Sequence, residues 1–463
     1  MLLRQLSIVL LCASPLLAGC GDDSDEPGSE PKGCALTEQT GCDAGLVCEE
    51  VEGGEPACFS PVTVRGRVFN ALDEVGIGGA RVLARDANGT VVSRVAITEP
   101  DGAYALPVPT KRSANGAPVR ADVTLRADAA GYDTFPRAPR VALPIDTSTA
   151  AGDPPAIETA ATAIALIPLE STAGLGTVSG TVVADAPGGT LVVAGGVTGA
   201  ADFGGAYTVF NVPAGEVNVR GYAAGLQLDK ATATVTAGQE TSGVDLHAVG
   251  DATAVVSGKV GIVNAPGGSE TSVILVVEET FNDAVARGEA PRGLRAFPVS
   301  SDFTIPDVPD GDYVILAGFE NDGLVRDPDT SIGGTEIVHI TVAGESISVP
   351  ESFKVTGALA VRGPGAEQIE EVTGTPSFVW EDDSSEGHYE VHLYDALGTL
   401  IWEDLAVPEV SGSEDVSVAY AGPALTPGMI YQFRAVSWSK PSGSSEPTPI
   451  SSTEDLKGVF LYK

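Results

Sequence analysis

Residues 62–68 read VTVRGRV, and this stretch decides the fold. Every second residue in it is Val or Gly, so alternate side chains fall on one face of an extended chain. The stretch DVTLRA at residues 122–127 alternates in the same way, and Asn88-Gly89 between the two is a strong hairpin signal. A two-residue period is typical of strands with one buried face. The pattern therefore predicts an all-β fold.

Two later stretches repeat the same skeleton. Each contains a Ser-Gly-x-Val strand, an aromatic-Thr-aliphatic strand and a Val-Pro-x-Gly turn: SGTV 179–182, YTV 207–209 and VPAG 212–215; SGKV 257–260, FTI 303–305 and VPDG 308–311. A repeated skeleton indicates repeated structural units. We therefore predict tandem β-sandwich units over three ranges: 61–170, 171–250 and 251–355. The last of these carries an insert at 279–297, expected to form a short helix or a long loop.

The last hundred residues differ from these units. All three tryptophans of the protein lie there, at Trp380, Trp402 and Trp438. The range 356–463 has about the length of one further β-sandwich domain. The body of the protein is therefore expected to contain four sandwiches joined by short connections such as 169–174 and 249–252, and short joints favour a rod.

Three motifs of the first unit resemble a known family. IGGARV at residues 77–82, DGAYAL at 101–106 and AAGY at 129–132 follow the VTVRGRV strand. This order resembles the carboxypeptidase regulatory-like domain, a small transthyretin-like β-sandwich, over residues 61–168. The resemblance implies that Tyr104 lies inward on its strand, after a glycine turn. The two later units look like weaker copies of the same domain.

A second resemblance concerns the C-terminal range. ALTPGMIYQFRA at residues 424–435 resembles the corner between strands E and F of a fibronectin type III domain, and Pro376, Phe378 and Trp380 are similar to its strand B. The resemblance implies that the hydroxyl group of Tyr431 bonds to nearby backbone and locks the turn.

Residues 1–19 have the layout of a secretory signal. Arg4 precedes the apolar run QLSIVLLCASPLLAG, which ends at Cys20. The run is too short to span a membrane, because a spanning helix needs about 20 apolar residues. LAGC at 17–20 resembles the lipobox of bacterial lipoproteins, which implies cleavage before Cys20 and lipidation of that cysteine. An unmodified cysteine behind an ordinary signal is the alternative.

Residues 20–33 are expected to form a membrane anchor and a tether. The stretch GDDSDEPGSEPKG has no large apolar side chain, so we predict a disordered, acidic segment. Two or more acyl chains at Cys20 would give stable anchoring. Gly21 and Asp22 do not look like an inner-membrane retention signal, so the resemblance implies a lipid-anchored location at the outer membrane or cell surface.

Four cysteines remain in residues 34–60: Cys34, Cys42, Cys48 and Cys58. An even number of cysteines in an exported protein indicates two disulfides, and three pairings satisfy the sequence. Zinc is the rival interpretation, but its ligand pairs usually follow C-x2-4-C spacing and no His lies nearby. A segment this short has no room for a core, so the disulfides are expected to hold it.

The protein is strongly acidic, with a formal net charge of −37 at pH 7. Such a surface repels the phosphates of nucleic acids and anionic lipid headgroups. We therefore expect no nucleic-acid partner. The charge suits a partner that is neutral, cationic or bridged by divalent ions, and solubility alone also accounts for it.

The sequence contains no recognisable catalytic or cofactor motif. None of the four histidines is followed at the third position by Glu, which excludes the H-x-x-E pair of a zinc peptidase: His247, His339, His388 and His392. The motifs G-x-S-x-G and G-x-x-x-x-G-K-[ST] are also absent. His388 and His392 would lie about 13 Å apart along a strand, too far to share one ion. His339 is expected on the polar face of its strand.

Two acidic stretches offer oxygen ligands for calcium. Asp382-Asp383 form one, and Asn321-Asp322-Gly323 with Asp327 and Asp329 form the other. The full EF-hand pattern is missing, and acid-rich turns are usually solvated turns. The sequence leaves both interpretations open.

These features favour a non-catalytic, membrane-anchored envelope or surface lipoprotein, acting as a structural or adhesin-like stalk with a protein or polysaccharide partner. A carbohydrate-binding protein is the alternative, because the regulatory-like sandwich resembles starch-binding-like folds. An exposed coplanar pair among Trp402, Trp438 and Tyr420 would favour it. An accessory subunit of an envelope enzyme is a further alternative.

Overall fold

The computed structural model describes most of the residues from Cys34 to Lys463. The described residues are 34–36, 40–86, 89, 91–263, 271–282, 287–319, 327–328, 337–349, 353–383, 386–410, 414–440, 447, 449–454 and 456–463. The predicted signal peptide, Cys20, the tether and Asn88 lie outside them. Within these ranges, no helix has the length and apolar character needed to cross a membrane.

The first unit consists of two sheets around one core. One sheet has the order β10-β3-β6, with β9 also on β3, and the other has the order β5-β4-β7-β8. Alternate residues of β3 are buried, as the two-residue period predicted. The elements are β3 (Val62–Asn70), β4 (Arg81–Arg85), β5 (Ala96–Ile97), β6 (Ala103–Val108), β7 (Asp122–Asp128), β8 (Ile145–Asp146), η1 (Thr147–Thr149), β9 (Ala156–Ile157), η2 (Ala160–Thr162) and β10 (Ala163–Leu166).

The second unit repeats this topology. Its sheets have the orders β14-β11-β19-β16, with β18 also on β11, and β13-β12-β15-β17. β11, the first strand of this unit, pairs antiparallel with β14 and parallel with β18 and β19. In the same way, β3 pairs antiparallel with β6 and parallel with β9 and β10. The strands are β11 (Leu175–Val183), β12 (Leu191–Ala194), β13 (Val197–Ala200), β14 (Ala206–Pro213), β15 (Gly215–Tyr222), β16 (Leu226–Leu228), β17 (Ala231–Val235), β18 (Glu240–Thr241) and β19 (Leu246–Asp251).

The third unit has the same plan, with sheets β23-β20-β27, including β28 on β20, and β22-β21-β24-β25, including β26 on β24. The described part of its insert forms the 3-10 helix η3, an extended connection and β22. Its elements are β20 (Ala254–Val263), β21 (Thr271–Val277), η3 (Glu278–Thr280), β22 (Arg295–Val299), β23 (Asp302–Val308), β24 (Gly311–Phe319), β25 (Asp327–Pro328), β26 (Val338–Val342), β27 (Ile347–Ser348) and β28 (Phe353–Thr356).

One glycine–aromatic pair marks the same place in all three units. The glycine of the first strand lies opposite an aromatic residue in matched register: Gly66 and Tyr104, Gly180 and Tyr207, Gly258 and Phe303. The Tyr104 hydroxyl donates to the Thr162 carbonyl, and the Tyr207 hydroxyl donates to the Val244 carbonyl. A Cβ on Gly66 would lie 2.0 Å from the first of these carbonyl oxygens, so only glycine fits. The three units therefore share one glycine–aromatic contact at matching positions.

The fourth unit pairs the sheet β29-β31-β34 with the sheet β30-β37-β35-β32-β33, in which β36 also lies on β35. Its core contains Phe378, Trp380 and Phe433. The Tyr431 hydroxyl accepts the Thr426 N–H at 2.9 Å, which is the contact expected of the corner. The strands are β29 (Val361–Gly363), β30 (Glu370–Val372), β31 (Ser377–Trp380), β32 (Glu386–Asp395), β33 (Leu400–Pro408), β34 (Val416–Ala419), β35 (Ile430–Ser439), β36 (Pro449–Ser452) and β37 (Val459–Tyr462).

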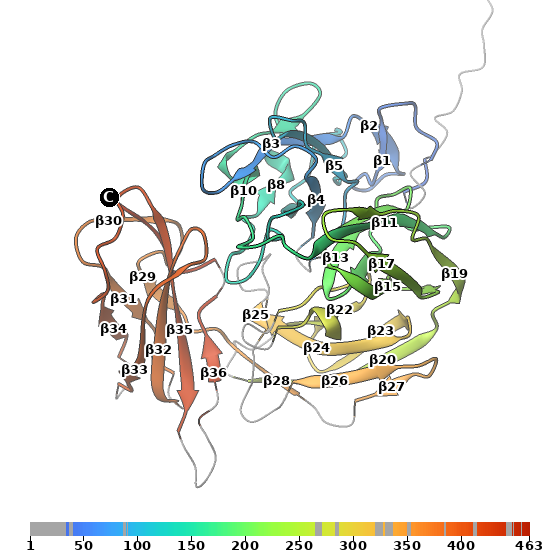
Figure 1. Ribbon diagram of the computed structural model, residues 1–463. Coiled ribbons are helices and arrows are strands. Elements are labelled where there is room, and N and C mark those ends of the chain that lie inside the picture. Colours follow the sequence, from blue (N-terminus) through green and yellow to red (C-terminus); the bar gives the residue numbers. More distant parts are fainter. Residues whose placement is uncertain are drawn as a thin grey trace, which may run out of the picture.

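The four units do not form the expected rod. The first three units are stacked, and the fourth lies beside the stack (Figure 1). The hairpin between β32 and β33 reaches back to the first unit, where Gly398 lies against Arg140. The first and third units are joined by the ion pair Arg85–Glu289 at 2.7 Å. Short joints limit the separation of neighbouring units, but contacts between non-neighbouring units set the shape.

Candidate functional site

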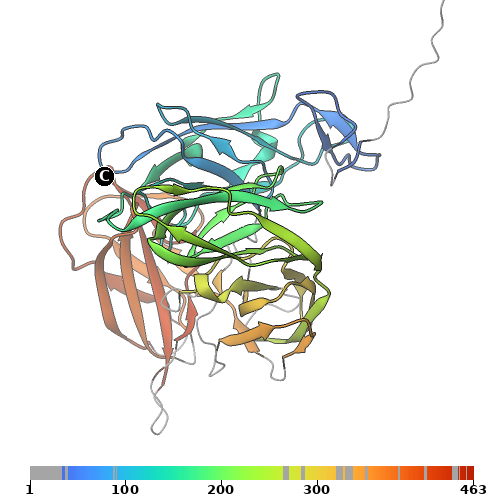
Figure 2. The same cartoon turned by 45° about the vertical axis from the view of Figure 1, so that its right-hand side comes forward.

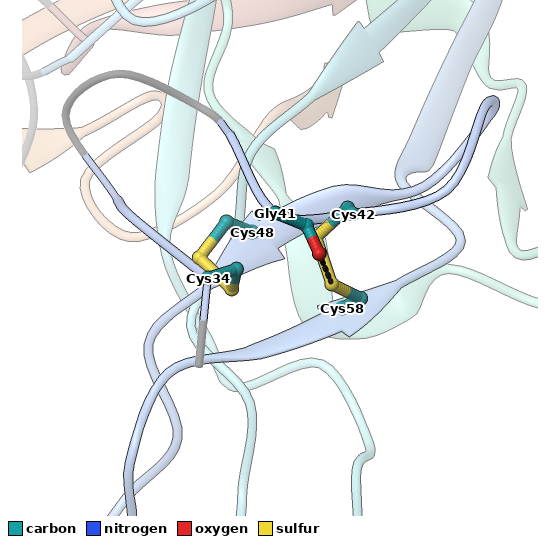
Figure 3. The surroundings of a disulfide bond; sticks show 5 residues. All are labelled: Cys34, Gly41, Cys42, Cys48 and Cys58. Carbon is teal, nitrogen blue, oxygen red and sulfur yellow. Dashed lines mark hydrogen bonds between the residues drawn. A yellow bond between two sulfur atoms is a disulfide. The ribbon is translucent and has the colours of Figure 1, made fainter. Parts of the chain in front are cut away.

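The disulfide module, residues 34–60, is built on a short hairpin of β1 (Val47–Glu49) and β2 (Ala57–Phe59). Cys34 is bonded to Cys48 and Cys42 to Cys58, so one of the three pairings is selected (Figure 3). Cys48 and Cys58 face each other across the hairpin, which brings the two disulfides together. The cluster formed by the sulfur atoms of Cys34, Cys42 and Cys58 is thus made of disulfide sulfurs.

The disulfide module docks on the first unit through a buried ion pair. The Glu49 carboxylate pairs with Arg112 and accepts the Thr110 N–H at 2.9 Å. Both charged residues are nearly fully buried, with exposures of 1% for Glu49 and 3% for Arg112. The Arg112 guanidinium also donates to the Ser60 carbonyl at 2.8 Å and lies over the ring of Phe59. A buried charge is tolerated only when it is paired and hydrogen-bonded, and this pair meets that condition.

The junction between the first and second units depends on Asn211. Its side-chain oxygen accepts the Gly131 N–H at 2.7 Å, and its side-chain nitrogen donates to the carbonyls of Ala129 and Tyr132. Gly131 in turn accepts the N–H of Leu169 from the connection between the two units. The AAGY turn of the resemblance is thus the surface on which the next unit docks.

The junction between the second and third units repeats this arrangement. The equivalent turn contains Gly225, whose N–H donates to the Asp307 carbonyl at 2.8 Å and whose carbonyl accepts the Ala252 N–H. The rings of Tyr222 and Tyr313 meet edge to face at 5.9 Å. Three residues of the second unit belong to the core of the third: Leu191, Val193 and Tyr222. These two units therefore pack as one body.

A charge cluster lies where the first three units meet. Glu289, from the insert, pairs with Arg85 at 2.7 Å and with Arg126 at 2.9 Å. Arg126 is completely buried, and it also pairs with Asp128 at 2.7 Å and donates to the Thr198 hydroxyl at 2.9 Å. Burial alone would raise the pKa of the Glu289 carboxyl, but the two arginines outweigh it and the pKa is lowered.

The insert therefore holds distant parts of the protein together. Besides Glu289, Arg292 donates to the Ala186 carbonyl in the second unit, and Arg295 pairs with Asp86 in the first unit at 2.8 Å. Sequence reasoning marked this insert as irregular but did not identify its charged residues as contacts. The local signal for such contacts was the mixture of acidic and basic residues within the insert.

The histidines occupy surface positions beside acids or aromatic rings. His339 is exposed, and its Nδ1 lies 2.8 Å from the Glu278 carboxylate, so its predicted place on the polar face is confirmed. His247 lies 3.5 Å from Asp229, and His392 lies 3.6 Å from Glu403. The ring of His388 stacks on Trp438 at 5.9 Å.

The three aromatic residues considered for sugar binding do not form an exposed coplanar pair. Trp402 and Tyr420 meet at 76°, and Tyr420 is buried with an exposure of 9%. Both belong to the packing around Phe378. Trp438 is half-buried and stacks on His388. These positions give the carbohydrate alternative no support.

One of the two acidic stretches can be placed. Asp382 accepts the Tyr389 hydroxyl at 2.7 Å, and Asp383 accepts the Ser437 hydroxyl at 2.9 Å. Glu386, which sequence reasoning missed, is buried beside them with an exposure of 3%, and its Oε2 has no hydrogen-bond partner within the part of the chain that the structure describes. In the other stretch, Asn321, Asp322, Gly323 and Asp329 lie outside the described residues. The calcium interpretation stays a prediction.

No family model matches the sequence, and a search of the curated proteins finds no match. Among solved structures, the protein is similar to the Bacillus anthracis TIE protein, at 11% identity and a TM-score of 0.15, over 83% of this chain and 65% of that one. It is also similar to BcpA, the major pilin subunit of Bacillus cereus, at 10% identity and a TM-score of 0.17, over 63% and 98% of the two chains. A DUF3823 family protein from Bacteroides ovatus has 15% identity and a TM-score of 0.20, over 45% and 100%. At these TM-scores the likenesses carry no argument, so the fold assignment rests on the protein's own sheets.

Proposed function

We propose that this protein is a non-catalytic envelope lipoprotein, anchored through Cys20 at the outer membrane or cell surface, that presents a rigid body of β-sandwiches to a protein or polysaccharide partner. The observation that carries the proposal is the set of direct contacts between units, above all the Glu289 cluster that joins the first and third units. A body fixed in this way presents its surfaces in a constant arrangement, which lowers the ordering cost of binding.

The lipobox-like residues LAGC at 17–20 support the anchor. The sequence offers no zinc-peptidase pair or serine elbow, which supports a binding or structural role over catalysis. The compact arrangement of the units replaces the extended stalk expected from the short joints. The body would thus sit near the membrane, at a distance set by residues 20–33.

Protease treatment of intact cells tests the anchor and the location together. We expect the native protein to remain with the membrane fraction and to be cut on whole cells, whereas Cys20→Ser releases it into the soluble fraction. Full protection in intact cells and cutting only after the envelope is opened would rule out display at the surface. Retention on the membrane of a Cys20→Ser variant from which residues 1–19 have been cleaved would rule out the lipid anchor.

Partner chemistry is tested with the soluble Cys20→Ser protein. We expect saturable binding either to one of a panel of cell-wall polysaccharides or to an envelope protein recovered by crosslinking in intact cells. A matched sample in which the units have been unfolded by heat controls for binding through charge alone. The absence of both results would contradict a binding role.

A further inference from the structure

The second and third units each bind a turn of the preceding unit, and they do so at equivalent ends. In the second unit, Asn211 lies at a bulge in β14 and binds the turn at Gly131. In the third unit, Asp307 lies at the matching bulge in β23 and binds the turn at Gly225. The two bulged residues share a left-handed conformation, with φ values of 60° and 59°. The bulge and the docking of a preceding turn thus occur together.

Among the described residues, no sandwich precedes the first unit, and its equivalent strand differs. β6 pairs with β3 in unbroken register, without the bulge. The connection after β6, residues 109–121, is also longer than the turn after β14, where β15 begins two residues later. This longer connection is where the disulfide module docks, through Thr110 and Arg112.

We propose that the disulfide module is an N-terminal cap, which occupies on the first unit the docking position that a preceding unit occupies on the second and third. Stacks of repeated units need such caps, because the first unit of a stack has no preceding unit to cover its docking face.

The contacts match this role. Backbone pairs join the two parts: the Arg112 N–H donates to the Glu50 carbonyl, and the Glu52 N–H donates to the Arg112 carbonyl, both at 2.8 Å. The Glu49–Arg112 pair is buried between them. Each partner would leave an uncompensated charge if the other were removed, so the disulfide module and the first unit are complementary. β1 and β2 accordingly lie at one end of the first unit (Figure 2).

The cap also connects the tether to the body. Residue 34 follows the predicted tether directly, and Cys34 is bonded to Cys48, the residue before Glu49. The end of the predicted tether is therefore joined to the first unit through two disulfides and one buried ion pair. This inference depends on contacts among the described residues and not on the proposed function.

Hydrogen exchange of the soluble Cys20→Ser protein with intact disulfides tests the cap. Glu49→Gln keeps an oxygen acceptor for Thr110 but removes the charge that faces Arg112. We expect amide exchange at residues 110–112 to rise by about tenfold or more, because a buried cation loses its partner. Glu50→Gln is the matched control, since its pair with Lys111 is largely exposed and should change exchange by less than about twofold.

A change at residues 110–112 no larger than in the Glu50→Gln control would overturn the proposal. Deletion of residues 34–60 gives a second measurement that does not depend on the fold of the disulfide module. The cap predicts self-association of this variant on size-exclusion chromatography and faster exchange along residues 109–121. A monomer with unchanged exchange there would show that the disulfide module is only an appendage. Neither outcome depends on lipidation, so failure of the cap and failure of the proposed function are distinguishable.

Discussion

Asn211 adopts a backbone conformation that most residues avoid and uses its side chain to join two units. Its φ is 60°, in the left-handed region, which asparagine tolerates better than other residues with a Cβ. Its amide group makes three hydrogen bonds to the turn around Gly131. Asparagine thus suits this position for two reasons: it tolerates the left-handed backbone conformation, and its amide group bonds to the turn of the preceding unit.

Asn211→Ala is expected to weaken the junction of the first and second units by about 4 kcal/mol, because it loses three hydrogen bonds of about 1 kcal/mol each and adds about 1 kcal/mol of backbone strain. Hydrogen exchange at residues 129–132 measures the effect. Asn211→Gly is the matched control, since it keeps the conformation and loses only the hydrogen bonds. An equal effect of both variants would exclude the contribution of backbone strain.

Glu386 gives a prediction for pH. Burial raises the pKa of its carboxyl, and the neighbouring Asp382 and Asp383 raise it further. The folded state therefore favours the protonated form, and the stability this group contributes below the ordinary Glu pKa of about 4.3 is lost as pH rises through the folded value. Glu386→Gln should raise the melting temperature at pH 7 and have little effect near pH 4.

Tryptophan fluorescence measures this change selectively, because all three tryptophans of the protein lie in the fourth unit. Asp395→Asn, at the far end of β32, is the matched control. The Glu386→Gln variant also tests the calcium interpretation. If calcium binds beside Asp382, Glu386→Gln will lower the melting temperature in added calcium instead of raising it.

At the scale of strands, a glycine opposite an aromatic residue recurs in each of the first three units. Gly180 lies on β11 opposite Tyr207, and the Val244 carbonyl fills the space that a side chain would need. Three elements converge at this point, since Val244 lies just before β19. The pairing explains why the Ser-Gly-x-Val motif recurs in the sequence.

Gly180→Ala is expected to destabilise the second unit by roughly 3 kcal/mol or more, because its Cβ would lie 1.9 Å from the Val244 oxygen and force the strands apart. Urea denaturation followed by hydrogen exchange on β11 and β14 measures the loss. Gly250→Ala is the control, since no atom lies within 4 Å of the position that the added methyl group would take. A similar effect of the two substitutions would contradict the steric explanation.

For the whole molecule, the shape depends on contacts between units that are not neighbours in sequence. Glu289 comes from the third unit, and both of its arginine partners come from the first. Its lowered pKa means that the stability contributed by the ionised carboxylate is present above the ordinary Glu pKa and is lost as pH falls through the folded value. The closed arrangement should therefore persist at neutral pH and open in acid.

Glu289→Gln is expected to cost about 3 to 5 kcal/mol at neutral pH, because it leaves the buried Arg126 and the half-buried Arg85 without their shared partner. Small-angle scattering should then show a larger radius of gyration than for the native protein. Glu279→Gln, an exposed position in the same insert, is the control. An unchanged radius would mean that the other contacts hold the stack without this cluster.

Local patterns were enough to predict the strands and the presence of two disulfides, and a repeated skeleton indicated repeated units, because each depends on residues close together in sequence or on the number of cysteines. The contact at Tyr431 was implied by the resemblance to a fibronectin type III domain. The pairing of Cys34 with Cys48, the docking of Asn211 on Gly131 and the reach of Glu289 to Arg126 could be known only from the packed structure. Those contacts join residues that are distant in sequence, and a lone asparagine or glutamate carries no periodicity that identifies its partner. The expected rod failed for the same reason, since joint lengths describe neighbouring units and the shape depends on contacts between units further apart.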